Sequence, residues 1–442
     1  MRFPILALLG AGLLAASVSA QAALPVKPDL TVAADGSGDF TTVQAAVASV
    51  PKGNHERVII LVKDGVYREK VRIDAADVTL IGQSRAGTRI EFPQGAVEFR
   101  RHPDKLGTAV VNINGDDCVL QNLTVQNTQN VIGVHAFAIY GRGDRTVITD
   151  ANVWSQGNDT LSLWRTSDGM FSEDAGAHAS PNGRYYHARL DVCGSVDFIC
   201  PRGWCYMVDS RIDEVNPRND AAIWHDGSRD RNMKFVLKDC RFDGVPNWRL
   251  ARHHHDAQFF LIGCVFAADM SNRAPSRVIY PLDGGTPSAD DLRQNREHDP
   301  TNRWGERLYF WNSHRDGGDY PWITQNLASA AGSPKPEQVT ARWTFDGAWD
   351  PENSAGPTVS RIETRDGQLA LIFSENVTVK GHPRLALRAG GFAHYASGSG
   401  SDTLCFAAPA GAQGPGWLDL GAGTIIATEA SAGVRVARLA VP

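Results

Sequence analysis

Outside its first residues, the sequence has no uncharged apolar stretch of about 18 residues or more, so we expect no membrane-spanning helix. It also has no basic excess, since 44 Lys and Arg face 49 Asp and Glu and the formal net charge is -5. This balance argues against a general nucleic-acid-binding protein and provides no overall attraction for an acidic polymer. The sequence lacks a Gly-x-Ser-x-Gly elbow, a Gly-rich phosphate loop and paired Cys-x-x-Cys motifs, which argues against the corresponding hydrolase, nucleotide and zinc sites.

The first residues have the pattern of an export signal. Arg2 provides a positive charge and Ile5 to Ala16 a short apolar run. Either Val18-Ser19-Ala20 or Ala20-Gln21-Ala22 provides a small-residue cleavage site. We therefore predict a signal peptide over residues 1–23 and a secreted or periplasmic protein; a buried N-terminal helix is the alternative, but the run lacks an amphipathic period. Export permits disulfides, yet seven cysteines, an odd number, do not suggest a disulfide framework.

The chain of 442 residues is long enough for two domains. Its larger, N-terminal part repeats a phrase in which Asn or Asp follows β-type residues and precedes a small or apolar residue. The spacing is irregular but stays within the range of about 20 to 50 residues that is typical of solenoids. Copies of the phrase occur at Leu120–Leu123, Ile148–Ala151, Leu190–Cys193, Met207–Ser210, Leu237–Cys240, Leu261–Cys264 and Trp311–Ser313. We expect each copy to be one turn of an all-β parallel β-helix, with equivalent residues stacked from turn to turn.

Two local predictions follow from this stacking. Cys193, Cys240 and Cys264 become small buried residues at equivalent positions, and a disulfide between Cys240 and Cys264 on successive turns would be allowed. Before the first turns, Thr41 to Val50 has apolar residues at helical spacing. We expect a short amphipathic helix there that covers the open end of the solenoid.

The composition changes near Asn353, where Asn353 to Pro357 has the make-up of a linker. Beyond it, short alternating strands such as Leu369 to Phe373 are separated by Gly- and Ser-rich turns, which predicts a small β-sandwich. The sequence of this part, at Phe373 to Val379 and Tyr395 to Gly400, resembles that of bacterial Ig-like modules. We therefore expect a catalytic β-helix over 28–352 and an Ig-like accessory module over 357–442.

Two aspartates stand in unusual settings. Asp197 lies inside the apolar phrase Gly194–Ile199, where an unpaired carboxylate would be costly to bury. Asp159 and Asp197 each come just after a copy of the repeated phrase, so stacking would bring them side by side. Adjacent carboxylates split their pKa values, and the pair can then supply a nucleophile and a general acid. The alternative, from these residues alone, is a structural Asn/Asp ladder at the turns.

A run of histidines, His253 to His255 followed by Asp256, resembles a metal-binding sequence at first sight. On a strand, however, alternate residues face opposite sides, so His254 cannot point with its two neighbours. We therefore expect a solvent-facing or cleft-lining run and no metal.

Several longer phrases keep a common order and spacing: Asp39–Gln44, Gly65–Glu69, His135–Ile139, Gly143–Arg145, Asn158–Leu161, Gly194–Ile199 and Leu250–Arg252. Together they resemble the pectin methylesterase (pectinesterase) family over roughly residues 28–352. The resemblance implies a right-handed parallel β-helix and an aspartyl carboxylic ester hydrolase. The substrate it implies is methyl-esterified pectin, and the products are methanol and de-esterified pectin.

The resemblance also assigns roles. Asp197 would be the nucleophile on the ester carbonyl, and Asp159 the general acid that protonates methanol and then the base that activates water. Arg252 would hold Asp197 ionised, because a guanidinium keeps its proton and binds a carboxylate bidentately. Amide groups such as that of Asn158 would stabilise the oxyanion. No metal or organic cofactor is expected, and Tyr67 and Glu69 are expected to be structural.

The sequence departs from the family pattern near these residues. Asn158 and His135 stand where the family typically has Gln, and His135 adds a group that titrates near pH 6.5. The common Arg-Pro-Trp becomes Arg252-His253-His254, so a sugar-stacking aromatic is missing. We expect a substrate-binding set of His135, Trp204, Trp248 and His254, in which either tryptophan packs in the core or stacks on a sugar.

Other functions remain open at this level. The same carboxylate pair would serve an esterase or thioesterase acting on another acyl substrate. A polyuronide lyase would need a calcium-binding carboxylate cluster and a basic residue, which the sequence does not assemble. A non-catalytic wall-binding protein is the third alternative. We expect a pectin-bound monomer with no nucleic-acid or membrane partner, the monomer being an expectation from the family alone.

Overall fold

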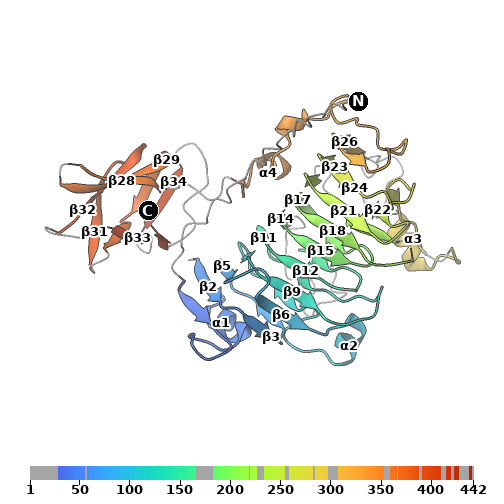
Figure 1. The fold of residues 1–442 in the computed structure, drawn as a ribbon, viewed down its shortest axis with the longest axis horizontal. Coiled ribbons are helices and arrows are strands. Elements are labelled where there is room, and N and C mark those ends of the chain that lie inside the picture. Colours follow the sequence, from blue (N-terminus) through green and yellow to red (C-terminus); the bar gives the residue numbers. More distant parts are fainter. Residues whose placement is uncertain are drawn as a thin grey trace, which may run out of the picture.

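The computed structural model describes residues 28–54, 57–165, 183–218, 220–225, 233–253, 258–281, 284–296, 307–352, 359–365, 367–387, 391–409, 415–419, 423–427 and 438–440. The predicted signal peptide and the linker at 353–357 lie outside them. The larger part is a parallel β-helix whose turns stack from β1 to β27 (Figure 1). Each complete turn adds one strand to each of three parallel sheets. The prediction of a parallel β-helix is therefore confirmed.

The three sheets share the strands in a regular rotation. The ten-stranded sheet contains β1 Leu30–Val32, β2 Val58–Val62, β5 Val78–Gly82, β8 Val119–Gln121, β11 Thr146–Thr149, β14 Gly183–Ala188, β17 Gly203–Val208, β20 Phe235–Lys238, β23 Gln258–Ile262 and β26 Arg307–Trp311. The nine-stranded sheet contains β3 Gly65–Tyr67, β6 Thr88–Phe92, β9 Thr124–Asn127, β12 Asn152–Trp154, β15 Asp191–Gly194, β18 Arg211–Glu214, β21 Arg241–Gly244, β24 Val265–Phe266 and β27 His314–Arg315. The eight-stranded sheet contains β4 Val71–Ile73, β7 Val111–Ile113, β10 Ile139–Gly141, β13 Leu161–Leu163, β16 Ile199–Pro201, β19 Ala221–His225, β22 Arg249–His253 and β25 Ser276–Arg277.

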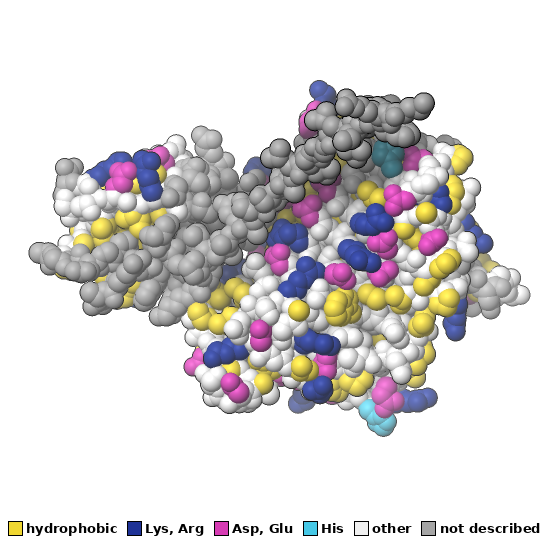
Figure 2. All heavy atoms as spheres, in the orientation of Figure 1, with side chains coloured by type: hydrophobic (Ala, Val, Ile, Leu, Met, Phe, Trp, Pro, Cys, Tyr) yellow, Lys and Arg dark blue, Asp and Glu magenta, His cyan; other side chains and the backbone are white. Residues whose placement is uncertain are grey.

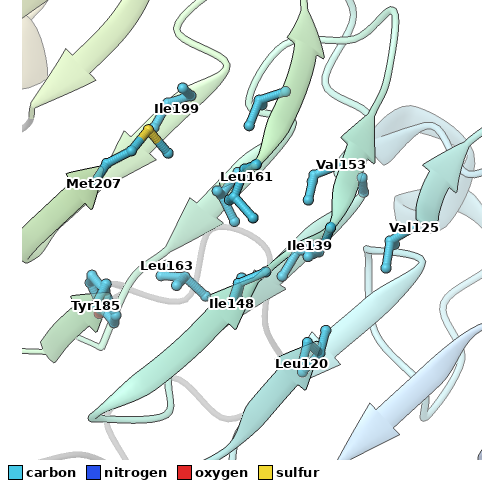
Figure 3. Packing of buried hydrophobic residues seen from close by; sticks show 14 of the residues in the cluster. Leu120, Val125, Ile139, Ile148, Val153, Leu161, Leu163, Tyr185, Ile199 and Met207 are labelled. Carbon is cyan, nitrogen blue, oxygen red and sulfur yellow. The ribbon is translucent and has the colours of Figure 1, made fainter. Parts of the chain in front are cut away.

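The inside of the β-helix is filled by apolar side chains that stack in columns. Leu120 and Ile148 represent the ten-stranded sheet, Val125 and Val153 the nine-stranded sheet, and Leu161 the eight-stranded sheet (Figure 3). All belong to one buried cluster that runs the length of the solenoid. Because each turn buries its apolar face only against the turns beside it, the register of every turn is fixed by its neighbours.

The repeated Asn/Asp phrase marks one corner of the β-helix. The residue that follows each strand of the ten-stranded sheet from β8 onward has a left-handed backbone, with φ between 45° and 64°. These corner residues are Asn122, Asp150, Arg189, Asp209, Asp239, Gly263 and Asn312. Asn, Asp and Gly tolerate this conformation better than other residues, which explains their recurrence.

The predicted alignment of the third copy of the repeated phrase, Leu190–Cys193, with the other copies is wrong. In the third copy Arg189 occupies the corner and Leu190 follows it, so Cys193 lies on β15 and is half-buried instead of being a core residue. Cys240 and Cys264 are buried on successive turns as expected, because the residues after them, Arg241 and Val265, pair. Both are free thiols in the structure.

The predicted end-covering helix is present as α1 Val43–Ala48. Thr42 caps it, and the two carboxylate oxygens of Glu69 accept hydrogen bonds from the backbone N–H groups of Val43 and Gln44 at 2.8 and 2.9 Å. Tyr67 is buried, and its hydroxyl donates to the carbonyl of Lys63 at 2.9 Å. Both family-motif residues, Tyr67 and Glu69, therefore have the structural roles expected of them.

The outer face of the ten-stranded sheet is covered by the last part of the β-helix chain. Leu327, Val339, Phe345 and Trp349 pack there against aromatic residues of β14, β17 and β23. This segment contains η2 Pro336–Gln338 and α4 Ala341–Thr344; two further helices are α2 Ala96–Arg101 and α3 Ala289–Arg296. None of the helices in the described residues is long and apolar enough to cross a membrane.

The residues after 358 form a separate antiparallel sheet with its own hydrophobic cluster. Its order is β28-β29-β32-β31-β30-β33-β35, with β34 paired to β29. The strands are β28 Val359–Arg365, β29 Gln368–Gly381, β30 Arg384–Leu387, β31 Phe392–Ser397, β32 Ser401–Ala407, β33 Pro415–Asp419, β34 Gly423–Ala427 and β35 Arg438–Ala440. Leu371, Leu385 and Phe406 lie at the centre of the cluster.

Gly194, at the end of β15, is required by close packing. A Cβ at this position would overlap the Cβ and ring of Phe198. We expect Gly194→Ala to lower the free energy of unfolding by about 1–3 kcal/mol, the range of overpacked cores, as measured by chemical denaturation. Gly53→Ala is the matched control, because nothing lies within 4 Å of its added Cβ. Equal stabilities of the two variants would contradict this account.

Candidate active site

The two aspartates lie on adjacent turns at the same register. β13 pairs with β16, with Leu161 opposite Ile199, and an isolated bridge pairs Asn158 with Val196. Asp159 and Asp197 each stand two residues before the paired leucine and isoleucine (both labelled in Figure 3). Their Cα atoms are therefore separated by roughly one strand spacing of about 4.8 Å.

Both aspartates have the left-handed backbone that also marks the structural corners. The φ angle is 55° at Asp159 and 47° at Asp197. Asp209 has 49° at a corner of the ten-stranded sheet, so the conformation alone does not identify a functional residue. What distinguishes Asp159 and Asp197 is burial, because their exposed fractions are 4% and 6%.

Asp197 is paired with Arg252 from β22. The Nε atom of Arg252 donates to Oδ1 of Asp197 at 2.8 Å, and Nη2 donates to Oδ2 at 2.5 Å. β22 is separated from β16 by β19, so Arg252 reaches back across two turns. Such a forked contact fixes the orientation of the carboxylate as well as its charge.

The electrostatics of Asp197 contain two opposing effects. Burial raises the pKa of Asp197 to about 6, and the hydrogen bond and charge of Arg252 act against that rise. In turn, Asp197 raises the pKa of Arg252 against the effect of burial. The pair therefore holds a desolvated carboxylate that is ionised above about pH 6.

Asp159 has different surroundings. Its Oδ2 accepts a long hydrogen bond of 3.4 Å from the hydroxyl of Ser162, a neutral donor. Ser162 faces away from the core because its neighbours Leu161 and Leu163 point inward. Two carboxylates one strand spacing apart suit different protonation states, as acid–base catalysis requires.

Asn158 and His135 join the same corner. Bridges pair His135 with Asn158 and Asn158 with Val196, so the three residues form one column. The Oδ1 atom of Asn158 is buried and has no hydrogen-bond partner among the described residues. Burial, and then the charge of Arg100, lower the pKa of His135. The pKa of His135 therefore lies below its usual range.

The two tryptophans of the predicted substrate-binding set lie elsewhere. Trp248 is fully buried inside the β-helix and stacks on Phe242 with ring centroids 6.2 Å apart. Trp204 is buried on the outer face of the ten-stranded sheet, with the ammonium of Lys234 4.4 Å from its ring centroid. Neither offers a face to a sugar in the column of the aspartates, so the prediction of sugar stacking is wrong for both.

The histidine run is only partly described. His254, His255 and Asp256 lie outside the described residues, while His253 is buried beside Phe259. In the part of the chain that the structure describes, no group of three or more His, Cys, Asp or Glu side chains is arranged to hold a metal ion.

An aromatic cluster that is not among the predicted site residues lies near the aspartates. Phe137, Tyr140 and Trp164 pack together with Cys200, which follows Asp197 by three residues. The guanidinium of Arg202 lies 3.6 Å from the ring centroid of Trp164. The sequence of β10 could have predicted an outward-facing aromatic residue here, because Tyr140 alternates with the inward-facing Ile139 and the small Gly141.

Comparison with known proteins gives consistent matches. The family model described as Pectinesterase matches residues 29–261. Pectinesterase 2 of Arabidopsis thaliana is 27% identical over 228 residues, which cover 50% of this chain and 35% of that protein. A pectinesterase of Petunia integrifolia is 29% identical over 220 residues, which cover 48% of this chain and 53% of that protein. The match thus spans only about a third to a half of the length of these relatives.

A solved structure supports the fold independently. A pectin methylesterase in complex with hexasaccharide VII superposes with a TM-score of 0.55 at 18% identity. The superposition covers 74% of this chain and 99% of that chain. At such low identity the likeness concerns the β-helix fold and does not by itself transfer a substrate.

Removing the guanidinium of Arg252 tests the ion pair. We expect Arg252→Ala to lower the free energy of unfolding by about 3–5 kcal/mol at neutral pH, because a buried carboxylate is left unpaired. Below pH 6 the loss shrinks, since protonation of Asp197 relieves the charge. Urea denaturation as a function of pH measures both effects. Arg218→Ala is the control, because Arg218 is exposed and has no ion-pair partner among the described residues. A loss equal to that of the control would contradict the pairing.

Proposed function

This chain belongs to the pectinesterase family, and from that premise we propose that it hydrolyses the methyl esters of galacturonate units in pectin. The products are methanol and a free carboxylate on the polymer. The observation that carries the proposal is the stacking of two buried aspartates, one of them held in a fork by Arg252. A buried carboxylate that remains ionised near neutrality is suited to nucleophilic attack.

In the proposed reaction, Asp197 attacks the ester carbonyl carbon and forms a tetrahedral oxyanion. Asp159, in its protonated form, gives its proton to the methoxy oxygen. The bond between the former carbonyl carbon and that oxygen breaks, and methanol leaves. The acyl group is then joined to Asp197 as an anhydride. Asp159, now ionised, takes a proton from water, and the resulting hydroxide releases the galacturonate carboxylate and restores Asp197.

Residues near the two aspartates are assigned supporting roles in the reaction. The amide of Asn158 stands one residue before the proposed acid and suits the oxyanion, whose stabilisation by one such donor is worth about 3 kcal/mol. His135, on the preceding turn of the same column, is assigned to substrate binding. Arg252 is a positioning residue for Asp197. His254 keeps its proposed substrate-binding role, although it lies outside the described residues.

We further propose the arrangement of the whole chain. Residues 1–23 are a signal peptide, 28–352 the catalytic β-helix and 357–442 an Ig-like accessory module that attaches or spaces the enzyme. Two findings support the last assignment: the C-terminal strands are antiparallel, and they have their own hydrophobic cluster. The protein would act in the periplasm or outside the cell, as a monomer and without a metal or organic cofactor.

One observation keeps a second candidate in view. Because Trp204 and Trp248 are buried, neither replaces the missing sugar-stacking aromatic. The same carboxylate pair would also hydrolyse another ester or a thioester. Methanol release from pectin compared with hydrolysis of simple acyl esters and thioesters separates the two candidates.

Substitution of the aspartates tests the mechanism. We expect Asp197→Asn to reduce methanol release from highly methyl-esterified pectin by at least about a thousandfold, because a carboxamide is a poor nucleophile. Asp159→Asn should lose about 100- to 10,000-fold, the usual contribution of a general acid or base. Circular dichroism must show both variants folded. Release that persists in the folded Asp197→Asn protein would refute the proposed nucleophile.

The pH profile tests the ionisation of Asp197. Since the pKa of this carboxyl is raised to about 6, the nucleophilic form is scarce below that pH and dominant above it. We expect kcat/KM for methanol release to rise tenfold per pH unit on the acid side and to level off above about pH 6. A profile that is already flat near pH 4, the range of an ordinary aspartate, would contradict the effect of burial.

A further inference from the structure

Ser162, on β13, places a buried hydroxyl between two oxygen acceptors. Its Oγ lies 3.4 Å from Oδ2 of Asp159, which precedes it by three residues. The same Oγ lies 3.4 Å from the carbonyl oxygen of Cys200, the residue opposite Ser162 on β16. A hydroxyl has one hydrogen and two lone pairs, so it can donate to only one of these oxygens at a time and can accept a hydrogen bond as well.

The surroundings of this hydroxyl are enclosed. Ser162 is fully buried, and Tyr140 lies opposite it on β10. Tyr140, Trp164 and Cys200 belong to one buried cluster. The indole Nε1 of Trp164 donates to the same Cys200 carbonyl at 3.1 Å, which leaves that oxygen a second lone pair for Ser162. At such depth a hydrogen bond is stronger than in water, so the direction of the Ser162 hydroxyl matters to Asp159.

Other carboxylates of the β-helix have fixed cationic partners. Figure 2 shows basic and acidic side chains interleaved over β18 and β21. Arg241, for example, forms ion pairs with Asp243 and Asp316. An arginine favours only the ionised form of its carboxylate, because it donates hydrogen bonds and never accepts them. A hydroxyl partner imposes no such choice on the carboxyl beside it.

The Ser162 hydroxyl can serve both protonation states of Asp159. When Asp159 is ionised, the hydroxyl donates its hydrogen to Oδ2. When Asp159 is protonated, its O–H can donate to a lone pair of Ser162, while the serine hydrogen turns to the carbonyl of Cys200. The change is a rotation about one C–O bond. No proton passes between the two residues, and no heavy atom has to move.

Resting on the proposed function, we propose that Ser162 is a positioning residue whose hydroxyl reverses from acceptor to donor as Asp159 turns from general acid into general base. After Asp159 has given its proton to the methoxy oxygen, the hydroxyl turns towards the new carboxylate and forms a charge-assisted hydrogen bond with it. When Asp159 then takes a proton from water, the hydroxyl turns back to the carbonyl of Cys200. Both halves of the reaction thus proceed with Asp159 held in place.

Ser162→Ala and Ser162→Thr test this role with highly methyl-esterified pectin. We expect Ser162→Ala to lower kcat for methanol release about tenfold, the effect of one hydrogen bond to a charged group, and to leave KM within about twofold. The alkaline decline of kcat, where Asp159 loses its proton in the substrate complex, should move to higher pH because the ionised form loses its donor. Ser162→Thr keeps a hydroxyl and should restore both quantities towards the wild type.

Ser210→Ala is the matched control. Ser210 is also a buried serine, but its Oγ accepts from the backbone N–H of Leu190 at 3.0 Å and donates to the carbonyl of Val208 at 2.8 Å. This variant should keep the wild-type kcat and pH profile. His135 on the preceding turn, and Asp197 with Arg252 on the other side, also act on the ionisation of Asp159. All the variants retain these groups, so a shift between variants reports the change at Ser162.

The outcomes separate the two proposals. If the wild type releases methanol and folded Ser162→Ala keeps its kcat and its alkaline decline, the role of Ser162 is wrong while the proposed function stands. A folded Ser162→Thr that is as slow as Ser162→Ala would also overturn it, since the hydroxyl would then not be the group that matters. If Ser162→Thr does not fold, the pH profile of Ser162→Ala decides alone, because lost packing does not move the alkaline decline. If the wild type releases no methanol, both proposals fail together.

Discussion

The fork between Arg252 and Asp197 is the interaction on which the rest of the site depends. Burial raises the pKa of Asp197 and so favours its protonated, non-nucleophilic form, and the guanidinium opposes that effect. The two residues are 55 positions apart. Asp197 lies just before β16 and Arg252 lies on β22, two turns further along the β-helix. The pair therefore forms only if β16, β19 and β22 keep their register, which links the chemistry of one carboxylate to the packing of the whole solenoid.

The β-helix acts as a scaffold with a fixed spacing. Equivalent positions recur from turn to turn at the start of the eight-stranded sheet, and on two adjacent turns the chain fills them with Asp159 and Asp197. The fold itself specifies no reaction, since Asn and Asp at the corners of the ten-stranded sheet have the same left-handed backbone as the two aspartates. Function in this account comes from which side chains occupy one column and from how deeply they are buried.

The sequence predicts the fold because a left-handed corner favours Asn, Asp or Gly, so one of these residues recurs after most strands of the ten-stranded sheet. At the corner that Arg189 occupies, no Asn, Asp or Gly is present, and Cys193 is wrongly predicted to be a buried core residue. The pairing of Asp159 with Asp197 is accessible to sequence reasoning because both follow the same kind of phrase. The burial of Trp248 is not, because a tryptophan can either pack in the core or stack on a sugar.

The most direct test of the central claim is the ionisation of Asp197 itself. Carbon-detected NMR of protein labelled at the aspartate carboxyl groups, with Asp197→Asn to assign the resonance, follows this carboxyl through a pH titration. The account predicts a single carboxyl that titrates at about pH 6 in the wild type and at a higher pH in Arg252→Ala. A resonance that titrates like an exposed aspartate, or that does not respond to loss of Arg252, would contradict it.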